Sequence, residues 1–158
     1  MPPDGHIFQI NISNGGVPKL AVHEAVVNHA GIIADQQANR KYHGGPDKAL
    51  CLYSLERILS LQGEGNRIFP GATGENVTLA GVDWEKIKPG ARLHLGPEVI
   101  VEVTNYTAPC NKISPYLLAA NIDRISQTNF PGWSRVYCRV LSTGTIKIAD
   151  PATIVEIE

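Results

Sequence analysis

The sequence has 158 residues, enough for one compact domain with an apolar core, and residues 1–158 are expected to form a single domain. Hydrophobic residues make up 43% and charged residues 18%, as in ordinary globular proteins. Fourteen Lys and Arg against fifteen Asp and Glu leave a net charge of −1. This balance argues against general binding to nucleic acids or membrane surfaces, because both select a basic excess.

The start of the chain and its cysteines together indicate a cytoplasmic protein. The first residues, "MPPDGHIFQIN", lack a basic segment followed by an apolar one, and no apolar run approaches the roughly 20 residues that span a bilayer. The three cysteines, Cys51, Cys110 and Cys138, are an odd number and lie far apart. Reduced thiols are therefore expected rather than a disulfide framework.

The first part of the chain predicts three strands and a helix. Apolar residues alternate in 6–13, and further strands are predicted at 19–27 and 49–54. Ser54 can cap a helix over 55–65, where apolar residues recur at helical spacing and glycines mark the end.

The rest of the chain adds strands and a second helix. A helix is predicted over 114–128, where Ser114 precedes Pro115 at the first helical position. Two alternating runs about the turn "STGT" predict a hairpin over 134–150. Single strands are predicted at 75–82, 91–96, 99–106 and 152–158. Many short strands, two helices and abundant turn residues favour a mainly β fold, a barrel or a closed, strongly bent sheet capped by the helices.

The stretch "KYHGGPDKALCLYS" gathers three titratable side chains around a Gly-Gly-Pro turn: His43, Asp47 and Lys48. Gly44 and Gly45 allow the backbone to approach either a ligand or another backbone closely. A tight turn with solvated polar residues explains the same pattern.

A second stretch, "FPGATGENVTLAG", places two glycines directly ahead of Glu75 and Asn76. The amide of Asn76 can both donate and accept hydrogen bonds, so it is a candidate contact for a polar ligand. A plain turn before a strand is the alternative explanation.

The third stretch, "TAPCNKIS", presents a thiol where a strand ends. Pro109 removes a backbone donor and biases Ala108 toward extended geometry. Cys110 is therefore expected to be partly exposed between a strand and a helix, and Lys112 could stabilise its thiolate. A buried, inert cysteine remains the alternative.

The other cysteines and histidines lie outside these stretches. Cys51 and Cys138 fall within apolar strand patterns and are expected to be structural. His6, His23, His29 and His94 stand apart from any cluster, and each is expected to be a strand or surface residue.

Five segments, "SNGGVPK", "HGGPDKALCLYS", "FPGATGENVTLAGVDW", "PGARLHLG" and "VEVTNYTAPCNKI", resemble the MOSC domain in sequence and in order. The family takes its name from the C-terminal domain of molybdenum cofactor sulfurase, and the chain resembles its small standalone bacterial type. The resemblance implies a mainly β fold built on a MOSC-type β-barrel, similar to the pyruvate-kinase β-barrel, with a few short helices. The sequence departs from the family pattern before Pro109, where Tyr106, Thr107 and Ala108 replace a common arginine.

The resemblance implies that the chain binds the molybdenum cofactor (molybdopterin) and that Cys110 is the molybdenum ligand. Relatives such as the mitochondrial amidoxime-reducing component reduce N-hydroxylated compounds. By this analogy Cys110, His43 and Asp47 are candidate catalytic residues, the last two as proton donors. The candidate cofactor-binding residues are Cys110, Lys112, Asn76, Gly44, Gly45 and Lys48.

The resemblance leaves other roles open. A reductase would take electrons from separate electron-transfer proteins, because the chain carries no cysteine-rich cluster. As a sulfur carrier, Cys110 would accept a persulfide from a cysteine desulfurase, and the family is also associated with pyridoxal phosphate enzymes. A third alternative is a non-catalytic barrel that holds a small ligand.

Overall fold

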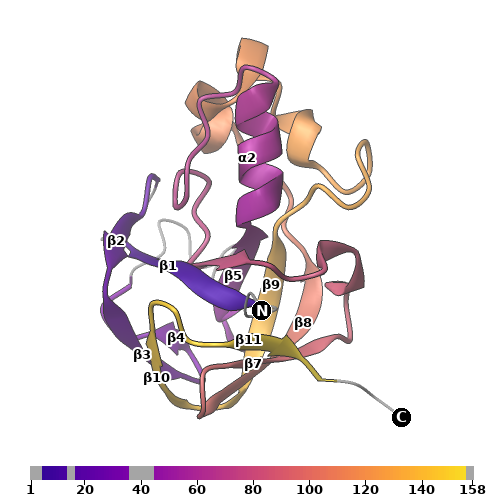
Figure 1. The fold of residues 1–158 in the computed structure, drawn as a ribbon. Coiled ribbons are helices and arrows are strands. Elements are labelled where there is room, and N and C mark those ends of the chain that lie inside the picture. The colour runs from indigo at the N-terminus through magenta and orange to yellow at the C-terminus, as the bar shows by residue number, and fades with distance from the viewer. Residues whose placement is uncertain (1–4, 14–16, 36–44, 156–158) are drawn as a thin grey trace.

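The structure is a computed structural model that describes residues 5–13, 17–35 and 45–155 (Figure 1). One α-helix, α2 (Leu55–Gly63), stands on a mostly β body. The strands are β1 (His6–Ile12), β2 (Leu20–Val22), β3 (Glu24–Asn28), β4 (Gly31–Ile32), β5 (Leu50–Ser54), β6 (Val77–Ala80), β7 (Arg92–Leu95), β8 (Val99–Tyr106), β9 (Val136–Ser142), β10 (Gly144–Lys147) and β11 (Ala152–Ile154). Short 3₁₀ helices span Pro46–Lys48, Trp84–Lys86, Asn111–Tyr116, Leu118–Ala120 and Ile122–Ile125.

The described strands form two sheets. The larger has eight strands in the order β11-β7-β8-β9-β5-β6-β1-β2, and the smaller has the order β10-β3-β4. Strands β5 and β6 pair in parallel, whereas all other strand pairs of the described residues are antiparallel. The expected mainly β class with a few short helices is therefore confirmed.

The large sheet bends so that its two ends approach each other. The amide of Ile7 in β1 donates to the carbonyl of Asp150, just before β11, at 2.8 Å, and the amide of Ala149 donates back to Ile7 at 2.8 Å. The ladders of the described residues nevertheless leave β11 and β2 as edge strands. A closed barrel is not confirmed and stays a prediction.

The core follows from the apolar alternation of the strands. In β8, Val99, Val101 and Val103 are buried while the residues between them are partly exposed, as expected for a strand with one face on the core. All five residues of β5 are buried, because this strand is covered on both faces.

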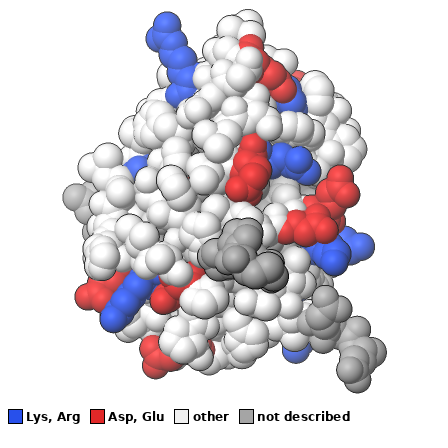
Figure 2. Space-filling view, viewed as in Figure 1, with Lys and Arg blue, Asp and Glu red and all other residues white. Residues whose placement is uncertain are grey.

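No helix among the described residues is long and apolar enough to cross a bilayer. Figure 2 shows basic and acidic side chains interspersed on the viewed face.

Helix α2 forms where the sequence predicts it. The Ser54 hydroxyl accepts a hydrogen bond from the amide of Arg57 at 3.1 Å and so caps the helix. Ile58 and Leu61 are the buried residues of the helix. The helix ends at Gly63, and Gly65 follows with φ of +103°, a backbone conformation that glycine adopts without strain.

Three predicted elements differ in the structure. The segment 19–27 is two strands that belong to different sheets, β2 and β3. The predicted hairpin over 134–150 is wrong: β9 pairs with β5 and β8, so both its edges are occupied, and β10 pairs with β3 instead. The predicted helix over 114–128 is also wrong, because Ala119 and Ala120 both have φ of +55° and break it into 3₁₀ turns.

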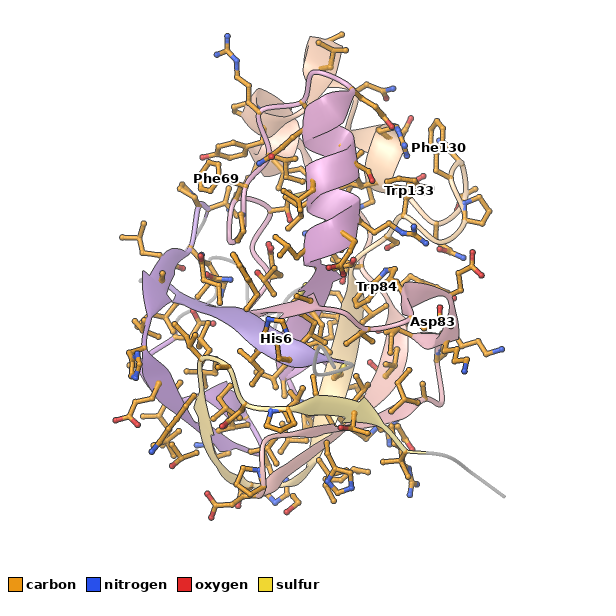
Figure 3. The ribbon with its side chains drawn as sticks, in the orientation of Figure 1. His6, Phe69, Asp83, Trp84, Phe130 and Trp133 are labelled. Atoms are coloured by element: carbon orange, nitrogen blue, oxygen red, sulfur yellow. The ribbon has the colours of Figure 1, made fainter. Side chains whose placement is uncertain are left out.

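The broken segment after Cys110 is held against α2 by stacked cations and rings. The Arg124 guanidinium lies 4.2 Å from the Trp133 ring centroid and 4.6 Å from that of Phe130, and it pairs with Glu64 at 2.7 Å. Arg57 of α2 lies over the same Trp133 ring at 4.7 Å. Trp133 and Phe130 lie beside α2 in Figure 3. Such contacts fix the segment that begins at the candidate site.

We expect Ser54→Ala to lower the free energy of unfolding by about 1 kcal/mol, because the Arg57 amide loses its acceptor at the start of α2. Urea unfolding monitored by circular dichroism would measure the change. Ser60→Ala, an exposed position on the same helix, is the matched control. Equal losses for both variants would show that the cap contributes nothing specific.

Candidate functional site

Cys110 lies directly beyond the end of β8. The chain leaves the sheet at Thr107, whose amide donates to the carbonyl of Arg135 at 2.9 Å. The 3₁₀ helix Asn111–Tyr116 begins immediately after Cys110, and the amide of Ile113 donates to the Cys110 carbonyl at 3.2 Å. Ile113 is buried and anchors this turn. Cys110 is half-buried, as the sequence predicts, whereas the thiols of Cys51 and Cys138 are buried.

The strand register brings several polar side chains to one face of the large sheet, at the end where Cys110 lies. Cys51 in β5 and Asn105 in β8 both pair with Tyr137 in β9, and residues paired directly across a sheet lie on one face. Arg135 precedes Tyr137 by two positions and Thr107 follows Asn105 by two, so they share that face. Together with Cys110, these residues form what we term the thiol cluster: Cys51, Thr107, Cys110, Arg135 and Tyr137.

The thiol cluster has its own internal contacts. The Cys51 sulfur lies 3.6 Å from the Thr107 hydroxyl. Burial is the main cause that raises the pKa of the Tyr137 phenol above its usual range, and Cys51 and Cys110 nearby raise it further. Burial likewise raises the pKa of the Cys51 thiol, against the opposing effect of Arg135. Tyr137 and Cys51 therefore stay protonated at neutral pH, beside the more exposed Cys110.

Arg135 is the buried cation of the thiol cluster. Arg135 is only 4% exposed, and its Nη1 donates to the carbonyl of Thr73. Nε and Nη2 are buried and have no hydrogen-bond partner among the described residues. A buried charged group with unpaired donors carries a large desolvation cost. We therefore expect a ligand or a water molecule to accept hydrogen bonds from Nε and Nη2.

The Thr73 loop that receives Arg135 is built around a buried carboxyl group. Glu75 is fully buried, and its oxygens accept from the Gly71 amide at 3.0 Å, the Thr73 hydroxyl at 3.0 Å and the Thr78 hydroxyl at 3.2 Å. Burial raises the pKa of Glu75. Gly71 has φ of +89°, and a Cβ there would lie 2.4 Å from the Lys19 carbonyl oxygen, so the turn accepts only glycine.

Asn76 connects this loop to β5 and to the N-terminal part of the chain. Its Oδ1 accepts from the amide of Cys51 at 2.8 Å, and its Nδ2 donates to Asp35 Oδ2 at 2.8 Å. The same Asp35 oxygen pairs with Lys19 Nζ at 2.6 Å, and both side chains are buried. Asn76 thus uses both ends of its amide within the protein, and its contact with a cofactor stays a prediction.

The structure separates the other predicted site residues. Lys48 Nζ lies 5.2 Å from the centroid of the Tyr137 ring, beside the thiol cluster. Asp47 is 70% exposed in its side chain, and its carboxylate lies 3.6 Å from the Arg139 guanidinium, away from the buried cluster. Lys112 and Gly45 are exposed. His43 and Gly44 lie outside the described residues.

Sequence patterns did not single out Thr107, Arg135 or Tyr137 as site residues. Each lies within or next to an apolar strand pattern. Only the register among β5, β8 and β9 shows that they share one face of the sheet, at the end where Cys110 lies. Among the described residues no group of three or more His, Cys, Asp and Glu side chains is placed to hold a metal ion.

The fold and the site together define a class of small, mainly β domains with a half-buried thiol at a strand end and a buried arginine on the neighbouring strand end. The family model described as "MOSC domain" matches residues 39–153. The chain therefore belongs to the MOSC domain family.

Similar proteins fit this assignment. Protein YiiM of Escherichia coli is 28% identical over 137 residues, which are 84% of this chain and 59% of that protein. A protein named "Reductase" from Gibberella moniliformis is 28% identical over 131 residues, 80% of this chain and 23% of that protein. The crystal structure of YiiM from Geobacillus stearothermophilus matches with a TM-score of 0.76 and 29% identity, covering 96% of this chain and 75% of that one. The chain spans less than two thirds of the length of each of these two sequence relatives, 59% of the first and 23% of the second.

We expect a small alkylating reagent at neutral pH to modify Cys110 alone in the folded protein. Cys51 and Cys138 are 6% and 0% exposed, and burial raises the pKa of both thiols, which keeps them protonated and unreactive. Intact mass would show one adduct before unfolding and three after it. Cys110→Ser should show none until unfolded, and rapid labelling of that variant would contradict the arrangement.

We expect the stability of Glu75→Gln relative to the wild type to increase with pH. Since burial raises the Glu75 pKa, the folded state holds the proton more tightly, and the stability from this group is complete below the unfolded-state value of 4.5 and is lost as the pH rises through the folded-state pKa. Urea unfolding from about pH 4 to about pH 8 would measure it, at about 1.4 kcal/mol per unit of pKa shift. Glu85→Gln, an exposed position, should show no such trend.

Proposed function

We propose that this chain binds the molybdenum cofactor through Cys110 and acts as a reductase of N-hydroxylated compounds that draws electrons from separate proteins. The observation that carries the proposal is the position of Cys110. It is the half-buried thiol at the end of β8, beside a buried cation, in a chain that belongs to the MOSC family. The relative named "Reductase" supports the reaction class.

The residues present fit such a cofactor. Molybdenum takes soft sulfur ligands, and a single accessible protein thiolate can complete a set that the cofactor's own sulfurs begin. The cofactor also carries a phosphate group, and the unpartnered Nε and Nη2 of Arg135 are donors suited to an oxyanion. Lys48, on the Tyr137 ring, adds a second positive charge beside the cluster. The donor set therefore matches one metal-bound thiolate and one anionic group.

The chain's own residues would hold and orient the reacting centre. Pro109 and the turn that begins at Asn111 fix the direction of the Cys110 sulfur. The Tyr137 phenol, kept protonated by burial, can donate a hydrogen bond next to that sulfur. Asp47, 70% exposed and paired with Arg139, remains a proposed proton donor at the surface of the site. When bound, the cofactor supplies the two-electron chemistry that cleaves an N–O bond, consuming two protons and releasing an amine and water.

The decisive test is metal and pterin analysis of protein purified from a host that makes the cofactor. We expect the wild type to carry molybdenum and pterin, and Cys110→Ser to lose at least about tenfold of the metal. Cys138→Ser, a buried thiol on the opposite face of the sheet, is the matched control and should keep it. Reduction of an N-hydroxylated amine by a chemical electron donor should fall in parallel with the metal content.

Wild-type protein without molybdenum or pterin would overturn this proposal and favour the sulfur carrier. The same half-buried thiol supports that role: the Cys110 thiolate would attack the outer sulfur of a cysteine desulfurase persulfide, forming a new S–S bond as the desulfurase thiolate leaves. Intact mass would then rise by one sulfur atom in the wild type and not in Cys110→Ser. Ligand binding that survives Cys110→Ala, with neither metal nor persulfide, would indicate a non-catalytic binding domain.

A further inference from the structure

The unpartnered donors of Arg135 lie on one edge of its guanidinium group. The Nε–H bond and one Nη2–H bond lie in the guanidinium plane and point outward along the same edge, parallel to each other. This edge matches two oxygens of a phosphate or carboxylate. Both atoms are buried and have no partner among the described residues. Nη1, on the other side, is already used by the Thr73 carbonyl. The free edge therefore offers a complete bidentate pair of donors.

Among the described residues no carboxylate is hydrogen-bonded to this edge. The Thr73 carbonyl that accepts from Nη1 carries no net charge. Glu75 acts on Arg135 only through space, because its carboxyl oxygens are taken by Gly71, Thr73 and Thr78. Arg135 is 4% exposed, and burying an ionised guanidinium without a hydrogen-bonded carboxylate carries a large desolvation cost. An anion at the free edge removes that cost.

The free edge belongs to the thiol cluster. The Arg135 carbonyl accepts from the Thr107 amide at 2.9 Å, three residues before Cys110. The charge of Arg135 lowers the pKa of both Cys51 and Tyr137 against the effect of burial, which places the guanidinium among these side chains. Lys48 Nζ lies over the same Tyr137 ring, 5.2 Å from its centroid, as a second cation.

We propose that Arg135 is the oxyanion-binding residue of this site and receives a phosphate group through Nε and Nη2. The proposal rests on the proposed function only for the identity of the molecule that carries the phosphate. Two sources share this chemistry: the phosphate of the bound cofactor, and a free or substrate-borne phosphate. A guanidinium in a buried site binds such a group by two parallel, charge-assisted hydrogen bonds.

The first arm of the test uses the full chain from a host that cannot make the cofactor. Inorganic phosphate is added at constant ionic strength against sodium chloride, and thermal unfolding is recorded. We expect the wild-type midpoint to rise by about 5–10 °C at a hundredfold excess over Kd. Arg135→Gln, which keeps a donor for Thr73 but lacks the charge and the fork, should lose most of this rise. Arg139→Gln, an exposed arginine on the same strand, should retain it.

The second arm identifies the source of the phosphate. Pterin content is measured in wild type and Arg135→Gln from a cofactor-competent host. Loss of pterin together with the phosphate response assigns the cofactor phosphate to Arg135. Retained pterin with a lost phosphate response assigns a separate phosphate. Arg135→Lys, which keeps the charge without the fork, should be intermediate in both arms and replaces Arg135→Gln if that variant does not fold.

Two results would overturn the proposal. A wild-type protein that responds equally to phosphate and chloride has a water at this edge, and an Arg135→Gln variant that keeps both the phosphate response and the pterin binds its anion elsewhere. Cys110→Ser separates this proposal from the proposed function: it should keep the phosphate response while losing molybdenum. If the wild type lacks molybdenum but responds to phosphate through Arg135, the oxyanion site stands and the metal role fails.

Discussion

The pairing of β9 on both of its edges is the constraint on which the site depends. The strand lies between β5 and β8 in the large sheet, so every backbone edge it offers is occupied. This position sets Tyr137 opposite Cys51 in the β5–β9 pair and opposite Asn105 in the β8–β9 pair. It also forces the chain after Ser142 to leave the sheet and pair with β3. A hairpin with β10 would have taken one of those edges and separated the thiol cluster.

The polar groups behind this cluster are nearly all satisfied within the protein. Asn76 joins the Cys51 amide to Asp35, and Glu75 closes the Gly71 turn with three hydrogen bonds. Satisfied buried networks fix a single arrangement of the backbone around them. The free edge of Arg135 differs from these groups, because Nη1 holds the guanidinium in place while Nε and Nη2 have no partner among the described residues. A rigid frame with one unused, charged donor pair is what a pre-organised binding site requires.

Much of the fold was predictable from local sequence, and two of the failures, the hairpin over 134–150 and the missed Arg135, share a cause. Alternating apolar residues identified most strands, and Ser54 with the following helical spacing identified α2, since both signals are local. Cys110 was placed at a strand end by the proline before it, and the structure confirms its partial exposure. The hairpin over 134–150 failed because pairing partners are set by the whole sheet. Arg135 was missed for the same reason: the face of a strand that meets a site depends on its neighbours' register.

The thiol and the cation of the site lie next to the ends of neighbouring strands, β8 and β9, whose antiparallel ladder is extended by one further backbone hydrogen bond. Cys110 follows β8 and Arg135 directly precedes β9, and the Thr107 amide joins them at 2.9 Å. The sequence carries no arginine between Tyr106 and Pro109, so the buried positive charge enters from across the ladder rather than along the chain. A displacement of either strand end moves both groups, whereas Lys48 and Asp47 belong to a separate segment, the 3₁₀ helix Pro46–Lys48. The separation between the Cys110 thiol and the Arg135 guanidinium is therefore set by the sheet, and not by the exposed loops around it.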